Sequence, residues 1–362
     1  MKLVVDTGLW RTDTEAEAAP LAAVLEVSGA VLAWTVDDPD PSAPPALTFT
    51  DPARADWLWR VTGERGHVEL LSALEDGPDR AVEVADLQLL AAPLAPLRKL
   101  ALGHWLRRWW PASRRDGIAL LDAALLDAEI AVLTAAAEAF FTDDTLDSDV
   151  AELLAPHAAA LASHARSGDS RVRTLAQAAL ELGEQNGIDA PDLVDAGRGR
   201  REDYALAAGG GNRSGALVIA DGVDSVRWAG VPASTFDAAE DTVDWSIEVA
   251  DAAVVAAVRV ALTGSGDPAG IAVRLVSAAV NATGVLDSSG TARLPVFDSG
   301  DRPLTEAVAW NHDWSTTAVT VGVPVGESAQ TRARLRAFAR ARLTTATADA
   351  FLAEVLAADS LY

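Results

Sequence analysis

The stretch TVDWSIEV, residues 242–249, decides the fold class of the C-terminal half of this chain. Apolar side chains occupy every second position, and Asp, Ser and Glu stand between them. Successive side chains of a strand point to opposite faces, so this alternation predicts a strand with one buried and one exposed face. The period of two returns at 256–262 and 271–275, where Arg259 and Arg274 take polar positions.

Turn signals separate these predicted strands. Asp221-Gly222 stands between two runs rich in β-formers and predicts a hairpin, and residues 287–290 predict another turn. Residues 318–323 predict a last strand. Seven or eight short strands joined by turns predict an antiparallel β-sandwich domain over residues 215–326.

The residues before this region, 83–187, are rich in alanine and predict a helical domain. From Ile118 to Phe140, apolar residues follow the three-and-four spacing of a buried helix face. Residues 142–149, TDDTLDSD, end this helix, and Pro156 is expected to kink or split the next one. Several packed helices are therefore expected here.

The remaining segments complete an α+β fold class. Residues 1–82 combine strand-like runs with a proline-rich loop at 37–45, which predicts a small mixed α/β module. Residues 188–214 have the composition of a linker, because three consecutive glycines leave the backbone too free for a regular element. Residues 327–362 predict a C-terminal helical tail. We therefore expect a mixed N-terminal module, an Ala-rich helical domain, and an antiparallel β-sandwich with C-terminal helices.

Composition and charge limit the functional classes. The chain has 362 residues, a net charge of -24 and no cysteine, which excludes disulfides, thiol nucleophiles and cysteine-bound metals. No run approaches the roughly 18 consecutive apolar residues of a membrane span, and the first residues lack a signal-peptide pattern. Lysine occurs only at Lys2 and Lys99, an arginine bias that suggests a GC-rich bacterial gene. We expect an acidic, soluble, cytoplasmic bacterial protein with no membrane partner.

A basic and aromatic island is the main candidate for a binding site. Residues 87–115 contain no Asp or Glu. We predict partner binding through six residues of this stretch: Arg107, Arg108, Trp109, Trp110, Arg114 and Arg115. Arginine binds acidic groups and tryptophan offers stacking surface. The competing interpretation is structural: the cations of the stretch spread around a helix, so the tryptophans would be core residues and the arginines would pair with the surplus acids.

A second basic row lies near the C-terminus. Arg332, Arg336 and Arg340 have the four-residue spacing of one helix face. In a chain this acidic, we expect the row to pair with the protein's own carboxylates in preference to a partner.

The histidines and acidic runs predict no metal or cofactor. His157 and His164 are seven residues apart, about 10.5 Å along a helix, which is too far for one ion. The acids of residues 143–152 lack the central glycine of a calcium loop. The glycine-rich run 209–215 lacks the Lys-Ser/Thr of a phosphate-binding loop.

His312 is the histidine that most resembles a catalytic residue, within WNHDWS, residues 310–315. Asp313 could orient it in a triad, but adjacent residues of an extended segment point to opposite faces. We favour a loop histidine packed between Trp310 and Trp314, and we assign no catalytic residue.

These observations favour a binding role over an enzymatic one. We predict a non-enzymatic protein-binding or scaffold subunit of a cytoplasmic bacterial complex, because eleven tryptophans and many arginines suit contact surfaces. The first alternative is a hydrolase whose site combines dispersed carboxylates with His312. The second alternative is a nucleic-acid accessory protein that uses residues 107–115, which is less favoured because the overall charge repels polyanions.

Overall fold

The computed structural model describes residues 2–14, 16–40, 42–75, 82–84, 87–141, 149–188, 217–250, 253–264, 266–345 and 347–360. Their helices and two antiparallel sheets confirm the predicted α+β fold class. The chain divides into two compact units, which are described separately below. Unit 1 comprises the described residues of Met1–Trp110, Leu121–Pro191 and Ala333–Tyr362, and unit 2 those of Pro111–Leu120 and Asp192–Arg332. Each unit therefore combines segments that are distant in the sequence.

Unit 1 contains a sheet with the strand order β3-β4-β5-β2-β1-β6. Its strands are β1 (Lys2–Asp6), β2 (Leu9–Thr12), β3 (Ala22–Val27), β4 (Ala30–Thr35), β5 (Ala46–Phe49) and β6 (Val82–Glu83). Burial alternates along β4, where Ala30, Leu32 and Trp34 face the core. This is the period of two expected for a sheet with one buried face.

The residues around Trp57 form helix where the alternation of Trp57 and Trp59 suggests a strand. Asp51 accepts a hydrogen bond from Ala53 N and starts a helical turn, and a second turn leads into α1 (Trp59–Glu75). Trp57 and the adjacent Leu58 are both fully buried. Two successive buried side chains do not fit the alternation of a half-buried strand.

Unit 1 contains helices within and beyond the helical stretch predicted for residues 83–187. They are α1, α2 (Ala91–Trp109), α3 (Ala123–Glu138), α4 (Val150–Leu154), α5 (Ala158–His164), α6 (Ser170–Gln185), α9 (Leu352–Asp359) and the part of α8 (Ala329–Thr344) from Ala333 onward. Pro156 separates α4 from α5 as predicted, within a short 3-10 turn.

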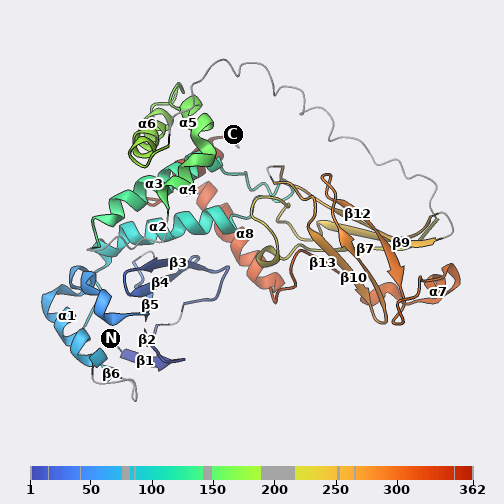
Figure 1. Ribbon diagram of the computed structural model, residues 1–362, viewed down its shortest axis with the longest axis horizontal. Coiled ribbons are helices and arrows are strands. Elements are labelled where there is room, and N and C mark those ends of the chain that lie inside the picture. Colours follow the sequence, from blue (N-terminus) through green and yellow to red (C-terminus); the bar gives the residue numbers. More distant parts are fainter. Residues whose placement is uncertain are drawn as a thin grey trace. The chain divides into compact units, whose positions relative to one another are not determined.

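Helix α2 is the centre of unit 1 and lies between the sheet and α3 (Figure 1). The indole of Trp105 donates a 2.6 Å hydrogen bond to the carbonyl of Pro20, which precedes β3. Because Gly103 has no side chain, Phe351, the N-cap residue of α9, can approach α2 closely. A Cβ at position 103 would lie 2.8 Å from the Phe351 ring. The C-terminal residues thus complete a core that begins with the N-terminal sheet.

Helix α3 begins later than its apolar spacing predicts. Asp122 caps it by accepting a 3.0 Å hydrogen bond from Leu125 N. Ile118 is instead bridged to Ser113 within the segment 111–120, which belongs to unit 2. An N-cap aspartate fixes where a helix begins, whatever apolar residues precede it.

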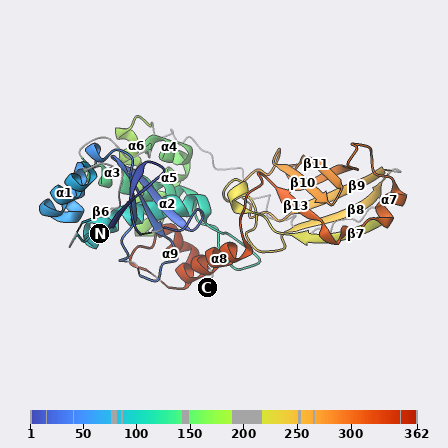
Figure 2. The same ribbon diagram turned by 90° about the horizontal axis from the view of Figure 1, so that it is seen from below.

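Unit 2 contains one sheet with the strand order β13-β10-β11-β12-β9-β8-β7. Its strands are β7 (Leu217–Asp224), β8 (Val243–Ala250), β9 (Ala253–Val260), β10 (Ala272–Ser277), β11 (Val280–Val285), β12 (Thr291–Phe297) and β13 (Ala318–Val321). Every pairing is antiparallel, as predicted. Strand β12 pairs with β9 through 291–295 and with β11 through 296–297, so one curled sheet replaces two separate ones. The short helix α7 (Glu306–Asn311) contacts β9 (Figure 2).

The predicted hairpin at Asp221-Gly222 is wrong, because both residues lie inside β7. They pair with Ser246 and Trp245 of β8. A Cβ on Gly222 would lie 2.5 Å from the Trp245 ring. The glycine is therefore needed for the close packing of the Trp245 indole, and it forms no turn.

The predicted linker falls almost wholly outside the described residues, since only Ile188 of residues 188–214 is described. The acidic run 142–148 and the glycine-rich run 209–215 also lie outside them. The domain limits drawn from composition stay predictions.

Candidate functional site

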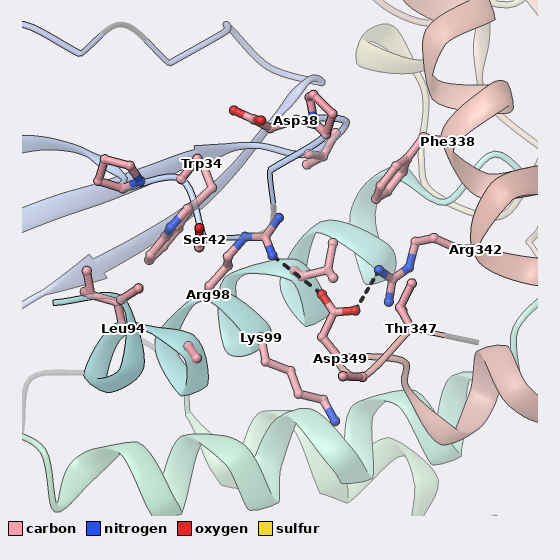
Figure 3. Close-up of a pocket in the computed structure, with 18 of the residues that line it drawn as sticks. Trp34, Asp38, Ser42, Leu94, Arg98, Lys99, Phe338, Arg342, Thr347 and Asp349 are labelled. Atoms are coloured by element: carbon pink, nitrogen blue, oxygen red, sulfur yellow. Dashed lines mark hydrogen bonds and ion pairs between the residues drawn. The ribbon is translucent and has the colours of Figure 1, made fainter. Parts of the chain in front are cut away.

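Unit 1 contains a pocket with a volume of about 850 Å³ (Figure 3). It is bordered by the loop that follows β4, by the first half of α2, and by the end of α8 with the segment after it. These three borders are separated by tens to hundreds of residues in the sequence. The fold of unit 1, and no local motif, therefore creates the pocket.

The wall of the pocket is mainly apolar. Its large apolar side chains are Trp34, Val36, Leu89, Leu94, Leu102 and Phe338. Trp34 reaches it because the alternation of β4 turns this side chain toward α2. On α2, the lining residues recur at the three-and-four spacing of one helix face.

Alanines create the open volume. Ala91, Ala92 and Ala95 on α2 and Ala341 on α8 border the pocket and stay exposed. A methyl side chain between two helices leaves space that a larger residue would fill. The alanine-rich composition was a sequence signal for this pocket, but alanine is equally common in tightly packed helices.

The rim of the pocket includes the predicted proline-rich loop. Asp40 accepts two hydrogen bonds from Ser42, 2.8 Å from the backbone and 2.6 Å from the hydroxyl, and these lower the pKa of Asp40. Asp37 accepts two 2.8 Å hydrogen bonds from Arg334 of α8. The loop is thereby attached to the helix on the opposite side of the pocket.

A buried ion pair supports the floor of the pocket. Arg342 donates two hydrogen bonds to the carboxylate of Glu354, whose side chain is 1% exposed. Arg342 also lies 3.2 Å from Asp349. Burial raises the pKa of Asp349, but the charge of Arg342 and its other polar contacts outweigh burial and lower it overall. Asp349 is therefore held as a carboxylate.

Two further cations line the pocket from α2. Lys99 lies 2.8 Å from Glu129 and 5.0 Å above the ring of Phe351. Arg98 lies 3.8 Å from Asp349, and its side chain is 19% exposed. Figure 3 places the Arg98 guanidinium between Trp34 and Asp349, with Arg342 beyond Asp349.

The four predicted island residues of unit 1 make contacts within that unit. Arg107 lies 3.0 Å from Asp127, a buried acid of α3. The guanidinium of Arg108 lies 4.1 Å from the ring of Trp109, and Trp110 is buried. These contacts match the structural interpretation of the island, and partner binding through it stays a prediction.

The two remaining island residues, Arg114 and Arg115, belong to unit 2. The backbone of Arg114 donates to Asp237 at 2.9 Å. The side chain of Arg115 donates to the carbonyls of Glu240 and Asp241 at 2.9 and 3.0 Å. Both residues therefore connect the segment 111–120 to residues 237–241 of unit 2.

The second basic row makes the expected contact with the protein itself at Arg332. Its guanidinium donates two hydrogen bonds to Glu240, at 3.0 and 2.8 Å. Arg336 of the same row is also buried. The predicted pairing with the protein's own carboxylates is confirmed for Arg332.

Two histidines of unit 1 pair with separate acids. His157 lies 3.0 Å from Asp127, and His164 lies 3.1 Å from Asp122. Within the described ranges, no group of three or more His, Asp or Glu residues could hold a metal ion.

His312 contacts Ser277, a serine that no sequence pattern relates to it. Its Nε2 lies 3.0 Å from the hydroxyl of Ser277, and its ring meets Trp314 edge-on at 4.4 Å. Ser277 is fully buried, so its hydroxyl is not accessible to a substrate. Asp313 accepts from Ser315 N and caps the next turn. The geometry resembles a packed loop histidine more than a nucleophile and its base.

Comparisons with known proteins add no family to this description. No family model matches the chain, and no curated protein and no solved structure matches it either. Among the helices that the structure describes, none is both long and apolar enough to cross a membrane. The functional conclusion therefore depends on the residues of the chain itself.

Proposed function

We propose that this chain is a non-enzymatic binding protein, and that the pocket of unit 1 holds a small apolar molecule. The pocket itself is the observation that supports this proposal. Its volume of about 850 Å³ lies within the range of roughly 300–1,000 Å³ typical of small-molecule sites. Its wall combines apolar side chains with a few convergent polar groups, the usual composition of such sites.

The polar groups of the pocket support binding over catalysis. Ser42 donates its hydroxyl to Asp40, and among the described lining residues there is no histidine to act as its base. The carboxylate of Asp349 is held by arginine and its pKa is lowered, which makes it a poor general base near neutral pH. These groups position a ligand and have no evident reaction to perform.

The test is calorimetric titration of the full chain with 1-decanol, an apolar probe without charge. Burial of each methylene contributes about 0.8 kcal/mol, so a ten-carbon chain should bind with a dissociation constant below about 1 mM. We expect Ala341→Trp, which fills the pocket, to abolish binding.

Ala337→Trp is the matched control. Ala337 is exposed on the same helix, one turn from Ala341, and does not border the pocket. This variant should bind 1-decanol like the native chain. No detectable binding to the native chain, or equal binding to both variants, would refute the proposal.

A further inference from the structure

The three cations that line the pocket differ in how closely carboxylates of the protein already pair with them. Lys99 has a carboxylate at 2.8 Å and an aromatic ring beneath it. Arg342 has both oxygens of Glu354 as well as Asp349. Neither has free capacity for a strong additional partner.

Arg98 differs from both. Among the described residues, its guanidinium has one ion pair, the 3.8 Å contact with Asp349, and it donates to no closer carboxylate. That distance is too long for a hydrogen bond, and Asp349 is closer to Arg342. A guanidinium carries five N–H donors, so with respect to the described part of the chain most of the donors of Arg98 remain available in a pocket with mainly apolar walls.

We infer that the ligand is an amphipathic monocarboxylate, whose apolar chain fills the pocket and whose carboxylate is bound by Arg98. This inference rests on the proposed function of the pocket. The planar guanidinium matches a carboxylate with two parallel hydrogen bonds. Apolar surroundings strengthen such a charge-assisted contact, because they weaken dielectric screening.

The acids near Arg98 limit the charge of the ligand. Asp349 lies 3.8 Å away, and the charge of Arg98 reaches Asp40 closely enough to contribute to its lowered pKa. Asp38 also borders the pocket. A second negative charge on the ligand would be repelled by these carboxylates, which favours a carboxylate over a phosphate dianion.

The experiment compares ligands that share a ten-carbon chain and differ in the head group. Decanoate, 1-decanol, decylamine and decyl phosphate are titrated calorimetrically into the full chain at pH 7.5. We expect decanoate to bind roughly tenfold tighter than 1-decanol, as one charge-assisted hydrogen-bond pair would give. Decylamine and decyl phosphate should bind more weakly than decanoate.

Arg98→Met keeps an apolar stem of similar length and removes the donors. This variant should lose the roughly tenfold advantage of decanoate while it binds 1-decanol as before, which also shows that the pocket remains folded. Arg65→Met is the control for the loss of one positive charge, because Arg65 is 92% exposed on α1.

The outcomes separate the two proposals. If the native chain does not bind 1-decanol, the proposed function itself fails. If 1-decanol binds as tightly as decanoate, or if Arg98→Met retains the advantage of decanoate, the assignment to Arg98 fails and the pocket remains. Tightest binding of decylamine or decyl phosphate would overturn the monocarboxylate.

Discussion

Arg342 and Glu354 form a doubly hydrogen-bonded ion pair between α8 and α9, and their side chains are 6% and 1% exposed. Glu354 also accepts a 2.9 Å hydrogen bond from Phe351 N, so it fixes the start of α9 as well. The pair joins two helices of the C-terminal segment beneath the pocket.

Loss of one partner of this pair should destabilise unit 1 strongly. Glu354→Gln leaves the guanidinium of Arg342 buried with Asp349 as its remaining described carboxylate, and breaking a buried pair typically costs about 3–5 kcal/mol. The free energy of unfolding from urea titration is the measurement. The double variant Arg342→Met/Glu354→Leu should lose less than Glu354→Gln, and a larger loss would contradict this account of the pair.

The stability contributed by Asp349 should depend on pH. Its pKa is lowered in the folded protein, so the unfolded chain takes up a proton at a higher pH than the folded chain does. The contribution is therefore complete above the ordinary aspartate pKa of 3.8 and declines as the pH falls below it. Asp349→Asn should unfold at a lower urea concentration than the native chain between pH 5 and 8, by a constant difference that shrinks near pH 3. A difference that grows on acidification would contradict this.

Gly222 should be intolerant of a side chain although it makes no turn. The Cβ of Gly222→Ala would lie 2.5 Å from the Trp245 ring and would displace this indole from its place against β7, at a cost of about 1–3 kcal/mol. Near-ultraviolet circular dichroism would report the indole, and urea titration the stability. Gly326→Ala is the control in unit 2, because the space around Gly326 is open and should leave both signals unchanged.

Partner binding through the island can be tested without a known partner. The native chain and Arg107→Ala/Arg108→Ala, both tagged, are used to capture proteins and nucleic acid at low salt. If the predicted partner binds there, a protein present in stoichiometric amount with the native chain will be absent with the double variant. A partner that both forms retain would exclude Arg107 and Arg108 as its binding site. Co-purified nucleic acid that salt releases would support the second alternative.

The sequence predicted most of the secondary structure where one period dominates. The alternation at 242–249 corresponds to β8, where Val243, Trp245 and Ile247 are buried and the residues between them are more exposed. Prediction from the sequence failed where one residue type serves two structural roles. Glycine serves turns and close packing equally, so Gly222 was assigned to a hairpin although the neighbour that decides its role is Trp245, on another strand.

The pocket could not be predicted, because its borders meet only in the folded chain. Trp34, Arg98 and Arg342 come from three segments, and no spacing in the sequence relates them. The basic residues posed a related problem. With 53 acidic residues available, the sequence indicates that arginines will find carboxylates. It does not indicate that Arg342 takes Glu354, or that among the described residues Arg98 has a single ion pair, at 3.8 Å to Asp349.

The contact of Gly103 with Phe351 has a consequence for synthesis on the ribosome. Roughly 250 residues separate the two, so at about 5–20 residues per second α2 must wait on the order of 12–50 s for the ring that completes its surroundings. During that time Ile130 of α3 is available to cover one side of Gly103, but the side that the Phe351 ring fills is uncovered, and the strands of unit 2 leave the ribosome before unit 1 can close. Nascent chains halted before Phe351 should therefore expose an apolar surface on their N-terminal half and depend on chaperones to remain unaggregated.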